Sequence, residues 1–109
     1  MNFREYQKKS RETAVYQNLG KNYIYPLLGL AGETGEVVEK FKKLLRNNDG
    51  VIDKEFIESI KKELGDVLWY ISQISTELDI ELDDIAETNI KKLKSRMERN
   101  VIKSYGDDR

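Results

Sequence analysis

Apolar residues recur every three or four positions along most of this chain, with charged residues between them, which is the pattern of amphipathic helices. Two stretches rich in Gly and Asn, Gly20-Lys-Asn22 and Asn47-Asn-Asp-Gly50, interrupt the pattern and predict turns. The predicted helices cover residues 2–18, 26–46, 53–78 and 83–97. The predicted fold is therefore all-α, a bundle of four to five helices.

Several residues near the predicted helix ends support these boundaries. Asn2 and Asp53 are suitable N-caps. Pro26 suits the first turn of the second helix, where a missing N–H has the smallest cost. The third helix, at about 25 residues, is long for a small domain and is expected to form its spine. In the fourth, Ile85, Ala86 and Ile90 are expected to face the core.

The second and third helices each carry two carboxylates three residues apart, Glu33 with Glu36 and Glu63 with Asp66. A step of three returns a side chain to nearly the same face of a helix. At about 100° per residue, the apolar stripe of each helix lies between about 20° and 140° from its first carboxylate, and the second carboxylate lies at about −60°. Packing the two stripes together would make all four carboxylates converge. The stripes consist of Leu30, Val37, Val38, Phe41, Leu44 and Leu45 in the second helix, and Phe56, Ile57, Ile60, Leu64, Val67 and Ile74 in the third.

Converging carboxylates repel one another and resist ionising together unless a cation lies among them. Oxygen ligands without soft donors favour a hard cation, Mg²⁺ or also Mn²⁺. The alternative is that each pair is an ordinary solvated helix edge, because 36% of the residues are charged. The matched phase of the two pairs favours the metal site.

This ExxE and ExxD pattern resembles the signature of the MazG-like all-α nucleoside triphosphate pyrophosphohydrolases, a family that includes dimeric dUTPases and dCTP pyrophosphatases. Here it reads Glu33-Thr-Gly-Glu36, then 26 residues, then Glu63-Leu-Gly-Asp66. The segments GLAGETGEV, KKELGDVLWY, TNIKKLKSR and YGDDR also resemble the short, single-domain bacterial and phage members. The resemblance implies one MazG-like domain over residues 1–109, with residues 100–109 as a polar tail and the acidic site between two long antiparallel helices.

The resemblance further implies Mg²⁺-dependent hydrolysis of a (deoxy)nucleoside triphosphate to the monophosphate and pyrophosphate, in nucleotide-pool sanitising. Glu33, Glu36, Glu63 and Asp66 would hold the metal. Catalytic roles are expected for Glu33, Glu36 and Glu39, and a carboxylate that is not fully used as a ligand would accept a proton from the attacking water. For Glu39 the alternative is a supporting role behind the metal ligands. Which carboxylate is the general base stays open.

Substrate contacts are expected from the third and fourth helices. By the resemblance, Asn89 and Lys92 help to hold the triphosphate, and Arg96 extends the same cationic face. Trp69, at about 240° on the same scale, lies off the core stripe on the Asp66 side. Either a subunit contact or stacking on the base would account for Trp69. No residue specifies the base or the sugar.

The composition narrows the chemistry and the partners. The chain has no Cys and no His, so thiolate and imidazole chemistry is excluded and acid–base work falls to carboxylates, Lys or Tyr. A net charge of −1 gives no field that favours a nucleic acid or a membrane. The charged N-terminus is no signal peptide and no stretch is long enough to span a membrane, so a cytoplasmic protein is expected. The resemblance implies a homo-oligomer, a dimer or a tetramer.

Two further questions stay open at this level. Gly29, Gly32 and Gly35 lie inside the second helix, either to let a neighbouring helix come close or to bring the acids within reach of a shared metal. The alternative to an enzyme is a non-catalytic helical nucleotide- or metal-binding module with a regulatory or interaction role. The intact ExxE and ExxD favour the enzyme.

Overall fold

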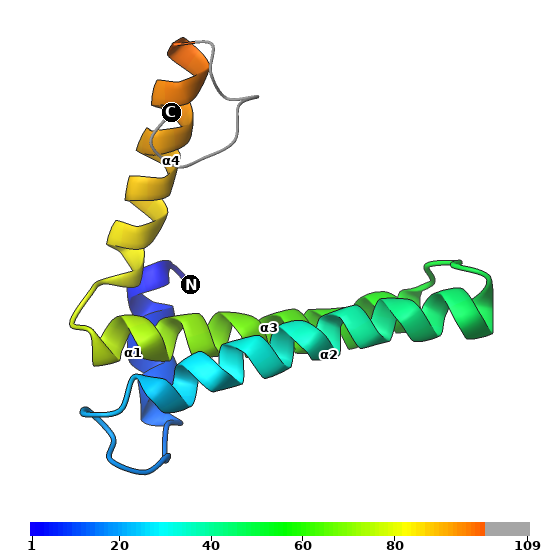
Figure 1. Ribbon diagram of the computed structural model, residues 1–109, viewed down its shortest axis with the longest axis horizontal. Helices are drawn as coiled ribbons and strands as arrows, with labels where there is room; N and C mark the ends of the chain where they lie inside the picture. Colours follow the sequence, from blue (N-terminus) through cyan, green and yellow to red (C-terminus); the bar gives the residue numbers. More distant parts are fainter. Residues whose placement is uncertain (100–109) are drawn as a thin grey trace.

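The structure, a computed structural model, describes residues 1–99, which form four α-helices without a strand among them (Figure 1). The helices are α1 (Phe3–Glu12), α2 (Ile24–Asn48), α3 (Lys54–Glu77) and α4 (Leu82–Glu98). The predicted all-α fold is confirmed. Within this described part, no helix combines the length and the apolar character needed to cross a membrane. The polar tail expected over residues 100–109 lies outside the described residues.

Local capping explains most of the helix ends. The side chain of Asn2 accepts a hydrogen bond from Glu5 N at the start of α1, and that of Asp53 accepts one from Phe56 N at the start of α3. Helix α2 ends where Asp49 and Gly50 adopt left-handed conformations, with φ of 52° and 74°. These predicted start and stop signals are confirmed.

Helices α2 and α3 form a long antiparallel hairpin, as the family resemblance implied (Figure 1). The rings of Phe41 and Phe56 meet edge to face near the closed end, with centroids 5.0 Å apart. Leu44 and Ile60 are buried between the helices. The apolar stripes therefore pack against each other in the predicted phase.

Much of each stripe is nevertheless uncovered in a single chain. Val38, Leu45 and Leu64 are more than half exposed. The prediction that Ile85 and Ile90 of α4 face the core is wrong for the single chain, because α4 packs on α1 and leaves the hairpin (Figure 1). The chain exposes 8404 Å², whereas a folded monomer of this mass exposes about 6300 Å².

The contact between α1 and α3 is polar. Ser10 Oγ lies 2.8 Å from Ser72 Oγ, and Gln73 Nε2 donates to Ser10 Oγ at 3.2 Å. Ser72 and Gln73 are fully buried. Every buried side-chain polar atom in the described residues has a partner, so this network avoids the penalty of unpaired polar groups. Sequence reasoning missed it, because Ser and Gln on a helix are usually solvated.

The first helix is shorter than predicted. It ends at Glu12 rather than near residue 18, and residues 13–23 form a link to α2. Val15, three residues beyond that end, is 91% exposed. The physical reason is a side chain of α3: the Tyr16 hydroxyl donates to the Glu77 carboxylate at 2.5 Å, which draws the chain away from the helix axis.

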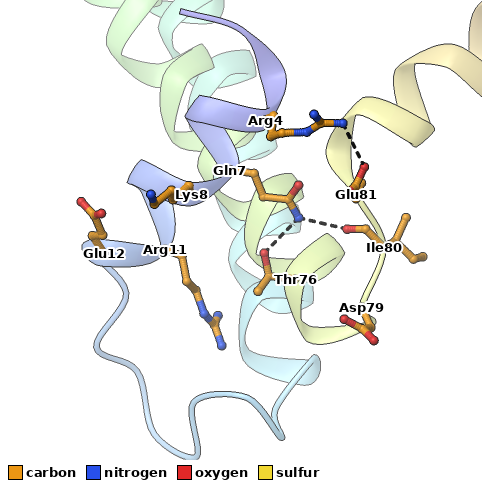
Figure 2. Close-up of a pocket in the computed structure, with 9 residues that line it drawn as sticks. All are labelled: Arg4, Gln7, Lys8, Arg11, Glu12, Thr76, Asp79, Ile80 and Glu81. Carbon is orange, nitrogen blue, oxygen red and sulfur yellow. Dashed lines mark hydrogen bonds and ion pairs between the residues drawn. The ribbon is translucent and has the colours of Figure 1, made fainter.

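Gln7 of α1 joins the ends of two other helices (Figure 2). Its Nε2 donates to Thr76 Oγ1 at 3.1 Å and to the Ile80 carbonyl at 3.0 Å. Its Oε1 accepts from Leu82 N at 2.8 Å and so caps α4, which Glu81 does not. Gln7 thereby fixes the direction in which α4 leaves the hairpin.

Candidate metal and nucleotide site

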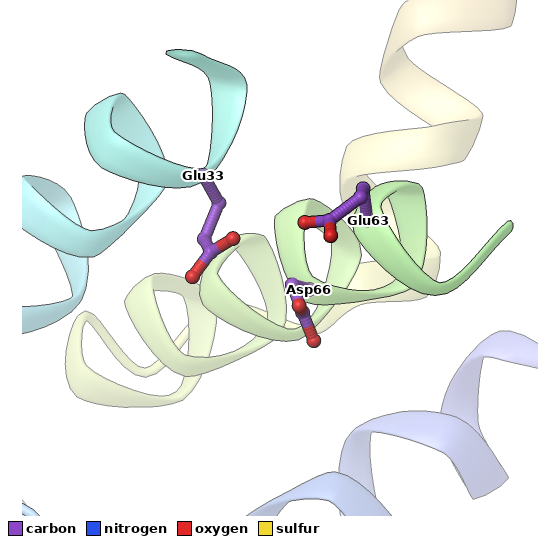
Figure 3. A group of neighbouring side chains, drawn as sticks. All are labelled: Glu33, Glu63 and Asp66. Atoms are coloured by element: carbon purple, nitrogen blue, oxygen red, sulfur yellow. The ribbon is translucent and has the colours of Figure 1, made fainter. Parts of the chain in front are cut away.

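The acidic group consists of three carboxylates, those of Glu33, Glu63 and Asp66, which meet on one side of the hairpin (Figure 3). Glu33 comes from α2, and Glu63 and Asp66 come from successive turns of α3. Each offers an oxygen atom, and these oxygens lie within 4.8 Å of one another. The antiparallel packing of α2 on α3 brings Glu33 to the two α3 carboxylates from 30 and 33 residues away in the chain.

Glu36, the fourth predicted ligand, is not in this group of three. Its side chain lies one turn further along α2 and is exposed. It is still near enough for its charge to act on Glu33. The structure thus groups three of the four predicted ligands and leaves Glu36 at the edge of the site.

The acids shift the protonation of Glu33. Partial burial raises the pKa of the Glu33 carboxyl, and the charges of Asp66, Glu63 and Glu36 raise it further. A cation among these oxygens would offset both the cost of burying an ionised carboxylate and the repulsion between the carboxylates. The donor set consists of carboxylate oxygens alone, in a chain without Cys or His, and so fits Mg²⁺ or Mn²⁺.

A lysine that sequence reasoning missed lies at the same site. Lys40 Nζ of α2 is 4.0 Å from Glu63 Oε1 of α3. Helical spacing suggests a pair between Lys40 and Glu36, four residues earlier. The approach of α3 provides Glu63 instead, and local spacing cannot reveal a partner on another helix.

Glu39, named as a catalytic candidate, lies outside the group of three. Its carboxylate is 3.9 Å from Lys42 Nζ on the same helix. An exposed pair of this kind is worth little to stability. The predicted role of Glu39 stays a prediction.

An aromatic group borders the acids at the end of the hairpin near α1. Tyr70 lies one helical turn after Asp66, and burial together with the charges of Tyr25, Glu33 and Asp66 raises its pKa. Trp69 stands edge to face with Tyr70, with centroids 5.0 Å apart. Its indole Nε1 donates to Thr13 Oγ1 at 2.8 Å.

The three α4 residues predicted to bind substrate do not join the acids in the single chain. Asn89 and Lys92 line a shallow groove on α4 with Ile80, Asp84, Ile85 and Thr88. Arg96 is largely buried. Helix α4 projects from the α1 side of the molecule, away from the hairpin that carries the carboxylates (Figure 1).

Comparison with known proteins identifies a family and a relative. The family described as the MazG nucleotide pyrophosphohydrolase domain matches residues 24–101, which include the acidic group. The "Gene 37 protein" of Mycobacterium phage L5 is 41% identical over 109 residues, covering 95% of this chain and 96% of that protein.

No solved structure matches the chain significantly. The family match covers most of the chain and all of the hairpin whose carboxylates converge. The chain belongs to the MazG nucleotide pyrophosphohydrolase family.

Proposed function

We propose that this protein hydrolyses a (deoxy)nucleoside triphosphate to the monophosphate and pyrophosphate in a Mg²⁺-dependent reaction. The convergence of Glu33, Glu63 and Asp66 from two helices carries the proposal, because such a group is costly without a cation and suits a hard one. Family membership supports the reaction class. Removal of unwanted nucleotides from the cytoplasmic pool is the role that suits this reaction.

The carboxylates would have two roles, metal binding and proton transfer. Glu33, Glu63 and Asp66 would hold Mg²⁺, or Mn²⁺, with Glu36 as the fourth ligand. The bound ion supplies charge neutralisation for the phosphate oxygens and the departing pyrophosphate. A carboxylate that is not fully used as a ligand (Glu33, Glu36 or Glu39) accepts the proton of the water that attacks the α-phosphorus. The bond from that phosphorus to the bridging oxygen breaks, and the oxygen leaves with pyrophosphate.

The remaining substrate contacts favour an oligomer. We expect Trp69 near the base, and Asn89, Lys92 and Arg96 on the phosphates. Because α4 leaves the hairpin in its own chain, its residues would serve the site of a second copy. The radius of gyration of 16.9 Å, against about 13 Å for a compact chain of this length, supports a dimer or a tetramer.

Pyrophosphate release from a panel of canonical and modified ribo- and deoxynucleoside triphosphates, in Mg²⁺, tests the reaction. Glu36→Gln and Asp66→Asn should both lower the rate by orders of magnitude. The control, Glu58→Gln, changes an exposed carboxylate of α3 that pairs with Lys61 and should leave the rate unchanged. If folded protein that still binds Mg²⁺ releases no pyrophosphate from any of these triphosphates, the non-catalytic module is favoured instead.

A further inference from the structure

A buried carboxylate outside the acidic group holds the link between α1 and α2. The Glu77 side chain, at the end of α3, is 1% exposed. It accepts hydrogen bonds from the Tyr16 hydroxyl at 2.5 Å, from Gly20 N at 2.9 Å, from Asn22 N at 2.8 Å and from Arg11 Nη2 at 2.9 Å. Three of these four donors belong to the link.

The link is shaped around this carboxylate. Asn18 and Gly20 adopt left-handed conformations, with φ of 54° and 91°, and two backbone N–H groups of the link converge on Glu77. Burial raises the pKa of Glu77, but the hydrogen bonds outweigh it and lower the pKa to about 2. The carboxylate is therefore ionised and fully engaged at neutral pH.

An aromatic series leads from this point to the acidic group. The ring of Tyr16 stacks on that of Tyr25, with centroids 5.0 Å apart and planes inclined by 21°. Tyr25 is tilted against Tyr70 at 6.5 Å. Tyr70 lies one turn from Asp66, and its ring lies against Gly29, one turn before Glu33. Tyr25 is about half exposed, so part of this series faces solvent beside the site.

We propose that Glu77 is a positioning residue that holds Tyr16 and Tyr25 as an aromatic wall for the nucleoside part of the substrate. The inference rests on the proposed function, because it takes the acidic group as the place of the triphosphate. Aromatic faces stack on any base, so the wall would distinguish a nucleotide from an inorganic polyphosphate rather than one base from another. Glu77 would touch neither substrate nor metal and would act only through the link.

Replacement of Glu77 by Gln should release the link and leave the helices in place. The amide keeps the volume, but its NH₂ group would face donors from Arg11, Tyr16 and the backbone. The contact between α1 and α3 retains its other hydrogen bonds, those of Ser10 with Ser72 and of Gln7 with Thr76. The expected loss is therefore local to the wall.

Calorimetry in Mg²⁺ tests the proposal with two probes, α,β-imido nucleoside triphosphates, which resist cleavage between the α and β phosphates, and inorganic tripolyphosphate. Wild-type protein should bind the nucleotide analogues more tightly than tripolyphosphate. Glu77→Gln should weaken the nucleotide analogues about tenfold, the size of one lost base–aromatic stack, and leave tripolyphosphate within about twofold. The control Glu58→Gln, the same change at an exposed position of α3, should alter neither.

Tyr16→Leu gives a second route should Glu77→Gln not fold. It removes the ring stacked on Tyr25 and one donor to Glu77, in the link rather than in a helix. The same selective loss of nucleotide affinity is expected. Circular dichroism at the titration temperature establishes that each variant is folded.

The outcomes separate this inference from the proposed reaction. Equal weakening of both probes, no weakening of either, or a wild-type protein that binds both equally would overturn the role of Glu77. Selective nucleotide binding that Glu77→Gln abolishes, in a protein that releases no pyrophosphate from natural triphosphates, would support the wall and overturn the reaction.

Discussion

The ring of Tyr70 on α3 lies against the backbone of Gly29 on α2, where a methyl group in place of the glycine hydrogen would overlap three of its ring carbons. This contact is one helical turn from Glu33 on one helix and one turn from Asp66 on the other. Close approach of the helices at Gly29 therefore helps to bring the two carboxylates together. Gly32 and Gly35 play no such part within residues 1–99, because no atom of that part of the chain lies within 4 Å of a Cβ added at either one.

Gly29→Ala should lower the free energy of unfolding by about 1–3 kcal/mol, since the cost of overpacking against Tyr70 exceeds the gain in helix propensity. Gly32→Ala, in the same helix and with free space around it, should raise the free energy of unfolding by about 0.5–1 kcal/mol. Urea denaturation of both variants at one protein concentration measures the difference. A stabilised Gly29→Ala would show that the ring does not pack there.

Mg²⁺ should stabilise the protein through Glu33. Burial and the neighbouring carboxylates raise the pKa of Glu33, so its stabilising contribution is present below the unfolded pKa and is lost as pH rises through the folded one. At pH 7 without metal, the ionised Glu33 carboxylate therefore lowers the free energy of unfolding. Glu33→Gln should raise the melting temperature in EDTA, because it removes that charge.

The same variant should lose its response to metal. Mg²⁺ at about 100 times its dissociation constant adds about 2.7 kcal/mol to the wild-type stability. Thermal melts in EDTA and in Mg²⁺, for wild type and Glu33→Gln, give the comparison. An equal Mg²⁺-dependent rise in both proteins would place the ion elsewhere.

Acid should loosen the link between α1 and α2 through Glu77. Its pKa is lowered to about 2 from an ordinary value of 4.5, so its contribution is present above pH 4.5 and disappears as pH falls toward 2. The contribution is about 3 kcal/mol at pH 7, of which about 2 kcal/mol is lost by pH 3. Urea titrations between pH 7 and pH 3 should show a shallower fall for Glu77→Gln than for wild type. Parallel curves would mean that Glu77 does not titrate in this range.

The elements that sequence could predict are those with local causes. Caps at Asn2 and Asp53, the stop at Asp49-Gly50 and the 3.6-residue period are properties of single segments, and the structure follows them. The phase of the carboxylates on their apolar stripes likewise predicted that Glu33 and Asp66 would meet.

The features that sequence could not predict depend on another element of the fold. The hydrogen bond that holds the link beyond the first helix joins Tyr16 to Glu77, 61 residues later in the chain, and no residue near Tyr16 indicates this partner. Lys40 pairs across the hairpin rather than along its own helix. The exposed Ile90 shows the same limit at a larger scale, because apolar periodicity marks a face to be covered without saying which chain covers it.

That uncovered surface leads to a prediction about assembly. The wild-type protein should run in size-exclusion chromatography with light scattering as a multiple of its 12.8 kDa chain at micromolar concentration. Its surface is about one third larger than that of a typical monomer of this mass. Ile90→Lys, on α4, should shift the distribution toward the monomer, because it places an ammonium group where apolar contact is expected.

Ser95→Lys is the matched control, since it adds the same charge at an exposed polar position of α4 and should leave the assembly intact. If α4 serves the site of a second copy, pyrophosphate release should fall with the oligomer in Ile90→Lys and persist in Ser95→Lys. A wild-type protein that runs as a stable monomer would contradict the predicted oligomer. A monomeric Ile90→Lys with full activity would instead show that each chain carries a complete site, and that the α4 residues are not needed at the phosphates.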